Sequence, residues 1–211
     1  MPKSALLLVD LQNDFCAGGA LAVPGANQTI RVANQLIAHF ASQGKKTIAS
    51  QDWHPAGHGS FASTQGAQPF SQGALEGLTQ TWWPDHCVQH SSGAAFVPEL
   101  NGKAIDHIVQ KGIQPETDSY SAFFDNGHRY DTGLHAWLGQ QAINTLIVMG
   151  LATDYCVKFT VTDALALGYQ VIVITDGCRG VNIQPEDSDL AMQQMADRGA
   201  RLMTLAQFLR Q

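Results

Sequence analysis

The sequence has few charged residues, and among them few basic ones. Charged residues make up 14% of the 211 positions, and 12 Lys and Arg stand against 18 Asp and Glu, for a formal net charge of −6. An acidic chain without a basic run is poorly suited to bind nucleic acid or an anionic membrane. The 45% hydrophobic content can form a core, which excludes an intrinsically disordered chain.

Long hydrophobic runs and paired cysteines are also missing. No apolar run approaches the ~20 residues that span a bilayer, and the run at 5–9 stops at Asp10, too early for a signal-peptide core. The four cysteines, at positions 16, 87, 156 and 178, form no Cys-x-x-Cys motif, which argues against a zinc ribbon or a thioredoxin motif. We therefore expect a cytoplasmic protein without a disulfide framework and without a membrane or nucleic-acid partner.

Three nucleotide-binding and hydrolase motifs are absent as well. No G-x-G-x-x-G follows the first apolar run, and neither a G-x-x-x-x-G-K-[ST] loop nor a G-x-S-x-G elbow occurs. These absences argue against a dinucleotide-dependent oxidoreductase and against a serine hydrolase.

What the sequence does contain is an alternation of strand-like and helix-like segments. Strands that are apolar throughout and alternate with helices predict a parallel sheet covered on both faces, so we expect one α/β domain over residues 1–211. The predicted strands are 5–10, 45–50, 105–110, 145–150, 170–175 and a short 201–204; the predicted helices are 27–43, 133–140, 154–167 and 185–198, with a last helical turn after 204.

Residues 51–104 interrupt this alternation. The segment is about 50 residues long, rich in Gly, Pro and Ser, and shows no clear periodicity. Excursions of this length are usually functional or disordered. Its aromatic residues, among them Trp53, Phe61 and Trp83, favour an ordered lid packed over a site.

Reactive side chains follow four of the predicted strands. Asp10 comes after the first, Asp52 and His54 after the second, Lys111 after the third, and Cys156 begins the helix after the fourth. Because ligands of open α/β sheets bind beyond the carboxyl ends of the strands, we expect these groups to converge on one site.

Cys156 is the candidate nucleophile of this site. Thr153 or Asp154 is a plausible N-cap of its helix, and a helix N-terminus favours a thiolate and can bind an oxyanion. Lys111 would stabilise the thiolate and Asp10 would move its proton. The competing interpretations are a buried structural cysteine, a capping Asp10 and a solvated Lys111.

A second candidate site is a metal centre. Asp52 and His54 lie two apart on an extended segment and so point the same way, and His86 follows in the same excursion. Two imidazoles and a carboxylate form a common open set for Zn, Fe or Mn. His58 and Ser60 remain open as a further ligand.

Five motifs resemble the nicotinamidase/pyrazinamidase family of isochorismatase-like cysteine hydrolases. They are LLLVDLQNDF (6–15), SQDWHP (50–55), WPDHC (83–87), KG with DSYSAFFD (within 111–125) and GLATDYCV (150–157), in this order along the chain. The resemblance implies a three-layer fold with a six-stranded, mostly parallel sheet. It also implies hydrolysis of nicotinamide to nicotinate and ammonia through a Cys thioester, in NAD salvage, with pyrazinamide as a further substrate.

The resemblance also implies roles for individual residues. Asp10, Lys111 and Cys156 would form the catalytic triad, and Asp52, His54 and His86 would hold one divalent metal ion, zinc before iron or manganese. A cis Leu151–Ala152 peptide would place the amides of Ala152 and Cys156 as the oxyanion hole. The ring pocket would be lined by Phe15, Leu21, Trp83, Tyr120, Phe123 and Tyr155.

Three other functions are compatible with parts of this pattern. An amidohydrolase of the same superfamily could act on a carbamoyl or ureido compound, although such relatives lack the metal set. A non-enzymatic scaffold would have lost the triad, which is complete here. A redox-sensing thiol protein would need a second cysteine near Cys156. The sequence does not distinguish a monomer from a homo-oligomer.

Overall fold

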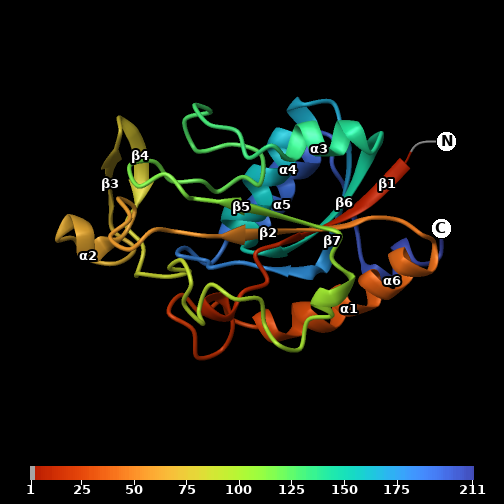
Figure 1. Cartoon of the computed structure of the whole chain (residues 1–211), viewed down its shortest axis with the longest axis horizontal. Coiled ribbons are helices and arrows are strands. Elements are labelled where there is room, and N and C mark those ends of the chain that lie inside the picture. Colours follow the sequence, from red (N-terminus) through yellow and green to blue (C-terminus); the bar gives the residue numbers. More distant parts are fainter. Residues whose placement is uncertain (1–2) are drawn as a thin grey trace.

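Six parallel strands form the centre of the molecule, with helices on both faces of the sheet (Figure 1). The computed structural model describes residues 3–211. Helices α1 (Ala26–Ser42) and α6 (Leu205–Phe208) cover one face, and α3 (Leu134–Gln140), α4 (Lys158–Ala166) and α5 (Asp187–Asp197) cover the other. This three-layer arrangement confirms the predicted fold class.

The sheet order puts the functional strands next to one another. All neighbours are parallel, and the register pairs Val9 with Gly150 and Asp52 with Lys111. From edge to edge the strands are β5 (His107–Lys111), β2 (Thr47–Asp52), β1 (Lys3–Val9), β6 (Ile143–Leu151), β7 (Gln170–Arg179) and β8 (Arg201–Met203).

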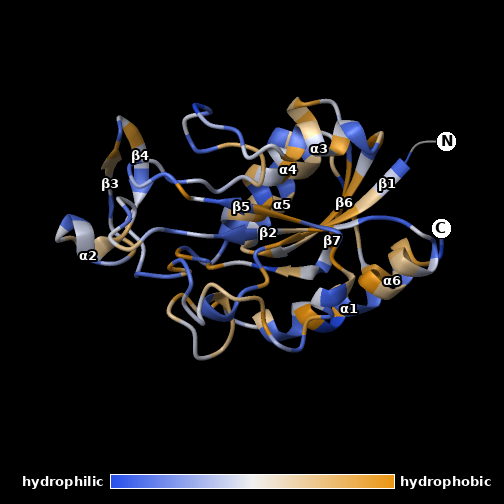
Figure 2. Ribbon diagram, in the orientation of Figure 1, coloured by the Kyte–Doolittle hydropathy of each residue, from blue (hydrophilic) through white to orange (hydrophobic). Residues whose placement is uncertain are grey.

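The core lies along the two central strands. In β1, Ala5 to Val9 are completely buried, as expected of a strand covered by helices on both faces. Residues of α1 spaced at helical intervals, such as Ala33, Ile37 and Phe40, bury the side that faces the sheet. Hydrophobic colour accordingly concentrates where the strands cross the middle of the molecule (Figure 2).

The excursion at 51–104 is ordered and contains local structure that the sequence pattern did not reveal. It forms α2 (Ala62–Gln65), a hairpin of β3 (Gln72–Leu75) and β4 (Leu78–Thr81), and a 3-10 turn at Gly102–Ala104. Another 3-10 turn, Asn13–Phe15, follows β1. Helix α2 and the hairpin lie at one end of the molecule and both termini at the other (Figure 1).

Two element boundaries differ from the sequence prediction. The helix expected at 154–167 starts as a π-helical turn, Thr153–Val157, before α4. Strand β7 continues to Arg179 because an irregularity in its pairing with β6 takes up extra residues between Val173 and Cys178. Among residues 3–211, no helix has the length and apolarity needed to cross a bilayer.

Candidate active site and metal centre

The carboxyl ends of four adjacent strands bring the predicted reactive groups together. Asp10 directly follows β1, Asp52 ends β2, Lys111 ends β5, and Cys156 lies in the turn after β6. Oxygen atoms of Asp10 and Asp52 and the sulfur of Cys156 all lie within 4.8 Å of one another. The structure therefore groups residues that are up to 146 positions apart in the sequence.

The Lys111 ammonium lies at the centre of this group. It is 1% exposed, and its Nζ donates to Asp52 Oδ1 at 2.6 Å and lies 3.0 Å from Asp10 Oδ2. The same Nζ lies 3.4 Å from Cys156 Sγ. Asp10 is further oriented by Ser50, whose hydroxyl donates to Asp10 Oδ1 at 2.6 Å. One cation thus bridges two carboxylates and the thiol.

Burial dominates the protonation of the thiol. It raises the pKa of Cys156 well above its ordinary value, although Lys111 acts in the opposite direction. Burial also raises the pKa of Asp10, with Lys111 opposing it. The pKa of Lys111 would fall on burial, but Asp10 and Asp52 hold it well above the usual range. The site therefore favours a neutral thiol next to a carboxylate that is a stronger base than an ordinary aspartate.

The predicted side-chain cap of the Cys156 helix is absent. Neither Thr153 nor Asp154 caps the helix, since the π-helical turn begins after Ala152 without a side-chain capping bond. The Asp154 carboxylate instead accepts hydrogen bonds from the backbone N–H of Val181 at 3.0 Å and of Asn182 at 2.7 Å. A side-chain cap therefore does not contribute to the activation of Cys156, and Lys111 and Asp10 are the neighbours that act on its proton.

The backbone in front of Cys156 has the expected conformation. The Leu151–Ala152 peptide bond is cis. The carbonyl of Ala152 accepts the N–H groups of Tyr155 and Val157, both at 3.1 Å, and Ala152 and Cys156 line the same cavity. Both predicted oxyanion-hole residues thus border the space next to the sulfur.

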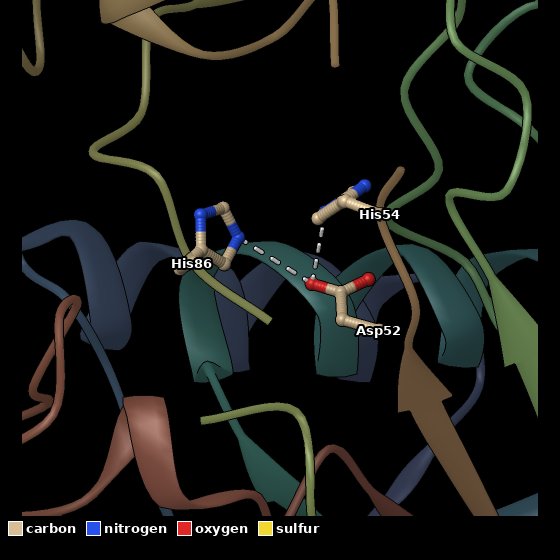
Figure 3. A group of neighbouring side chains, drawn as sticks. All are labelled: Asp52, His54 and His86. Atoms are coloured by element: carbon tan, nitrogen blue, oxygen red, sulfur yellow. Dashed lines mark ion pairs between the residues drawn. The ribbon is translucent and has the colours of Figure 1, made fainter. Parts of the chain in front are cut away.

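Asp52, His54 and His86 form a compact set of potential metal ligands (Figure 3). Asp52 Oδ2 lies 3.5 Å from Nε2 of His54 and 3.6 Å from Nε2 of His86. Each ring uses Nδ1 on a backbone carbonyl, His54 on Gly112 at 2.9 Å and His86 on Pro84 at 2.7 Å. Because a carbonyl only accepts, Nδ1 carries the proton and the lone pair of each Nε2 faces Asp52, so the donor set fits a divalent ion.

His58 and Ser60, the two candidates for a further ligand, make hydrogen bonds to other groups instead. Nε2 of His58 donates to the carbonyls of Gln114 and Thr117, at 2.8 and 3.2 Å, and its Nδ1 lies 2.8 Å from the Ser60 hydroxyl. Both nitrogens of His58 are therefore engaged. His58 orients Ser60, and the structure does not bring either residue into the cluster of Asp52, His54 and His86.

An aromatic cavity adjoins both groups of residues. Its free volume is about 20 Å³, room for little more than one water molecule, so a ring-sized ligand requires the lining side chains to move apart. Trp83 packs edge-on against Tyr155, with ring centroids 4.7 Å apart, and its Nε1 donates to Tyr120 Oη at 3.2 Å. The lining residues are Phe15, Leu21, Asp52, Trp83, His86, Asp118, Tyr120, Ala152, Tyr155, Cys156 and Val181.

Phe123 is not among the lining residues. It is 1% exposed and stacks on Tyr169 in the core, with centroids 5.9 Å apart. The assignment of Phe123 to the ring pocket was therefore wrong. In a motif with several aromatic residues, spacing alone does not separate those that face a ligand from those that face the core.

Other residues of the site were missed by the sequence analysis. Asp118 and Val181 line the cavity, and buried Gln12 holds the backbone of Asp52 through two hydrogen bonds of 2.8 Å, one to its N–H and one to its carbonyl. Asp118 opens the DSYSAFFD motif and Gln12 lies in LLLVDLQNDF, so the motifs contained a signal for both. Val181 lies outside the five motifs, so the sequence did not mark it as a residue of the site.

Comparison with known proteins gives a consistent assignment. The isochorismatase domain family model matches residues 4–207. The chain is 65% identical to the nicotinamidase of Escherichia coli (strain K12) over 206 residues, 98% of this chain and 97% of the relative. The solved nicotinamidase/pyrazinamidase of Acinetobacter baumanii superimposes with a TM-score of 0.92 at 39% identity, covering 98% of both chains.

A third relative was solved with a metal. The pyrazinamidase of Pyrococcus horikoshii in complex with zinc has a TM-score of 0.79 at 35% identity, covering 96% of this chain and 99% of the other. On the sequence identity, the fold and the family match together, the chain belongs to the isochorismatase domain family and, within it, to the nicotinamidases and pyrazinamidases.

Proposed function

We propose that this protein is a nicotinamide amidohydrolase that releases nicotinate and ammonia in NAD salvage and also accepts pyrazinamide. One observation carries the proposal: the Cys156 sulfur, the Asp10 carboxylate and the Lys111 ammonium meet beside an aromatic cavity that also contains Asp52 and His86. In the proposed complex these lining side chains move apart to admit a flat heteroaromatic ring between Phe15, Trp83 and Tyr155, and its carboxamide would then face the sulfur.

The residues support a two-stage acyl transfer. Asp10 takes the thiol proton as Cys156 attacks the carboxamide carbon, and the amides of Ala152 and Cys156 receive the developing oxyanion. The C–N bond breaks as Asp10 returns the proton to the departing nitrogen, because ammonia rather than an amide anion must leave. Water, deprotonated by Asp10, then hydrolyses the thioester to nicotinate. Lys111 stays protonated and keeps Asp10 and the sulfur aligned.

Asp52, His54 and His86 would hold one divalent ion, and we propose zinc. Bound there, the ion would supply a Lewis-acid contact for a ring nitrogen and so fix the orientation of the ring. The zinc complex of the Pyrococcus relative supports this choice. All four cysteines are free in the structure, and we propose a cytoplasmic location, where they would remain reduced.

The test is ammonia release from nicotinamide by the zinc-loaded protein and by its Cys156→Ala variant. We expect release by the wild type and none above background by the variant, with both proteins unfolding at similar temperatures. Appreciable residual turnover by the variant would reject the thioester route. An inactive wild type would reject nicotinamide and favour carbamoyl or ureido amides as the substrates.

A further inference from the structure

Asp118 is a buried carboxylate that the proposed reaction does not use. It is 3% exposed and lines the same cavity as Cys156. Its Oδ1 accepts the N–H of Ser119 and its Oδ2 accepts Nε2 of Gln80, both at 2.8 Å. Gln80 belongs to β4, so the hairpin of the excursion holds this side chain in place. A buried charge needs a compensating partner. The two donors to the Asp118 carboxylate, the Ser119 N–H and the Gln80 amide, are both neutral.

The position of Asp118 points to the metal centre. One of its carboxylate oxygens and ring nitrogens of His54 and His58 lie within 4.8 Å of one another. His58 is occupied by Ser60 and by the carbonyls of Gln114 and Thr117. Asp118 therefore lies next to His54, a proposed metal ligand.

The charges around the cavity support the same conclusion. Lys111 lies between Asp10 and Asp52, and this trio carries a net charge of −1. Imidazoles that bind a metal are neutral, so the trio alone would leave one charge of a divalent ion uncompensated in a buried site. The carboxylate of Asp118 supplies the second negative charge.

We propose that Asp118 is a positioning residue of the metal centre, which raises the affinity for a divalent ion without coordinating it. It would do so by balancing the charge of the ion and by accepting hydrogen bonds from the ion's remaining, non-protein ligands. This proposal rests on the metal set proposed above. It predicts that metal affinity depends on the negative charge at position 118 and on the Gln80 side chain that holds it.

The test measures zinc dissociation constants of the metal-free protein by competition with a chromophoric chelator. We expect Asp118→Asn to weaken zinc binding by about 10–100-fold, the usual effect of removing a group that supports metal ligands from outside. The matched control is Asp163→Asn, which removes another buried carboxylate, one that contacts His128 away from the site. We expect its zinc affinity to equal that of the wild type.

A second variant guards against misfolding of the first. Gln80→Leu keeps the charge of Asp118 but removes the donor to its Oδ2, and we expect zinc affinity to fall several-fold. A merely structural role would lower the melting temperatures of the metal-free and zinc-loaded forms equally and leave the dissociation constant unchanged. Wild-type affinity in both variants would therefore overturn the role of Asp118, whereas a wild type that binds no zinc would overturn the metal centre itself.

Discussion

Lys111 is the residue on which the charges of the active site depend. Its ammonium touches Asp10, Asp52 and the Cys156 sulfur, and at 1% exposure water cannot replace it. The two carboxylates hold its pKa well above the usual range against the effect of burial, so it stays a cation throughout the pH range of enzyme assays. Its role in the proposed reaction is therefore electrostatic and does not involve losing its proton.

Replacing this cation should affect both stability and turnover. We expect Lys111→Met to lower the free energy of unfolding by about 3–5 kcal/mol, because it leaves buried carboxylates unpaired, and to reduce ammonia release by roughly 10²–10⁴-fold. Urea titration of the zinc-loaded protein and a nicotinamide assay measure the two effects. The double variant Asp10→Asn/Lys111→Met should regain stability but no activity. A double variant less stable than Lys111→Met would contradict the charge argument.

Gly112 supports the metal centre through a contact that only glycine allows. Its φ is +66°, its carbonyl accepts Nδ1 of His54, and a Cβ atom would overlap the His54 ring. We expect Gly112→Ala to weaken zinc binding by about tenfold, since it displaces a ligand and its backbone support. Gly44→Ala is the control: its φ is +63°, but a Cβ there would meet nothing within 4 Å. Equal zinc affinities of the two variants would show that the overlap is harmless.

At the scale of elements, the segment between β5 and α3 is organised by Asp125. This buried carboxylate accepts four hydrogen bonds, from the N–H groups of Arg129 (2.6 Å), Tyr130 (2.7 Å) and Gly127 (3.0 Å) and from the hydroxyl of Thr117 (3.1 Å). Burial alone would raise its pKa, but these donors hold the pKa below the ordinary value. The same segment carries Tyr120 and Asp118 into the cavity.

The lowered pKa of Asp125 gives a pH-dependent contribution to stability. A carboxyl group with a lowered pKa stabilises the folded state above its unfolded pKa of about 3.9 and loses that contribution as the pH falls through its folded pKa. We expect Asp125→Asn to be less stable than the wild type by about 2 kcal/mol at pH 7, with the difference shrinking below about pH 4. Urea unfolding of both proteins at pH 7, 4.5 and 3.5 measures this. A difference independent of pH would contradict it.

The regular elements were largely predictable from the sequence, and the excursion was not. Apolar runs identified the inner strands of the main sheet, such as β1 and β6, because strands buried on both faces carry an unambiguous pattern. The edge strands β5 and β8 are partly exposed, and their prediction relied on the alternation with helices. The hairpin at Gln72–Thr81 escaped because its residues form no apolar run and its buried positions are polar, Gln80 and Thr81. It is held by contacts distant in sequence, such as Gln80 with Asp118. Thr153 and Asp154 are residue types that often cap helices, which is why the sequence suggested a cap there. In the fold, the Asp154 carboxylate instead accepts the N–H groups of Val181 and Asn182.

For the whole molecule, the sheet order explains why the site could be predicted. Strands β5, β2, β1 and β6 are neighbours, so any residue at their carboxyl ends must lie near the others. The sequence contained the strand ends and the motifs, and these were sufficient to identify the triad and ligand candidates. Two features were not visible in the sequence. One is the direction of each side chain, which puts Tyr120 in the cavity and Phe123 in the core. The other is the degree of burial, which raises the pKa of Cys156.

The proposed metal ion would link this site to the stability of the whole chain. An ion that binds only the folded state stabilises it by about 4.1 kcal/mol at a concentration 1,000 times its dissociation constant. For a chain of this size that corresponds to roughly 8–16 °C in melting temperature. We therefore expect zinc removal by a chelator to lower the melting temperature by about this amount and zinc addition to restore it. Differential scanning calorimetry measures both steps.

The control for zinc removal is the His54→Ala variant, which lacks one proposed metal ligand. In His54→Ala, Asp52 and His86 would remain as two donors, too few for tight binding, so zinc content and affinity for nicotinamide should both fall. Its melting temperature should then be the same with and without zinc, even if it is lower than that of the wild type. A full zinc-dependent rise in this variant would remove His54 from the ligand set and place the ion elsewhere in the molecule.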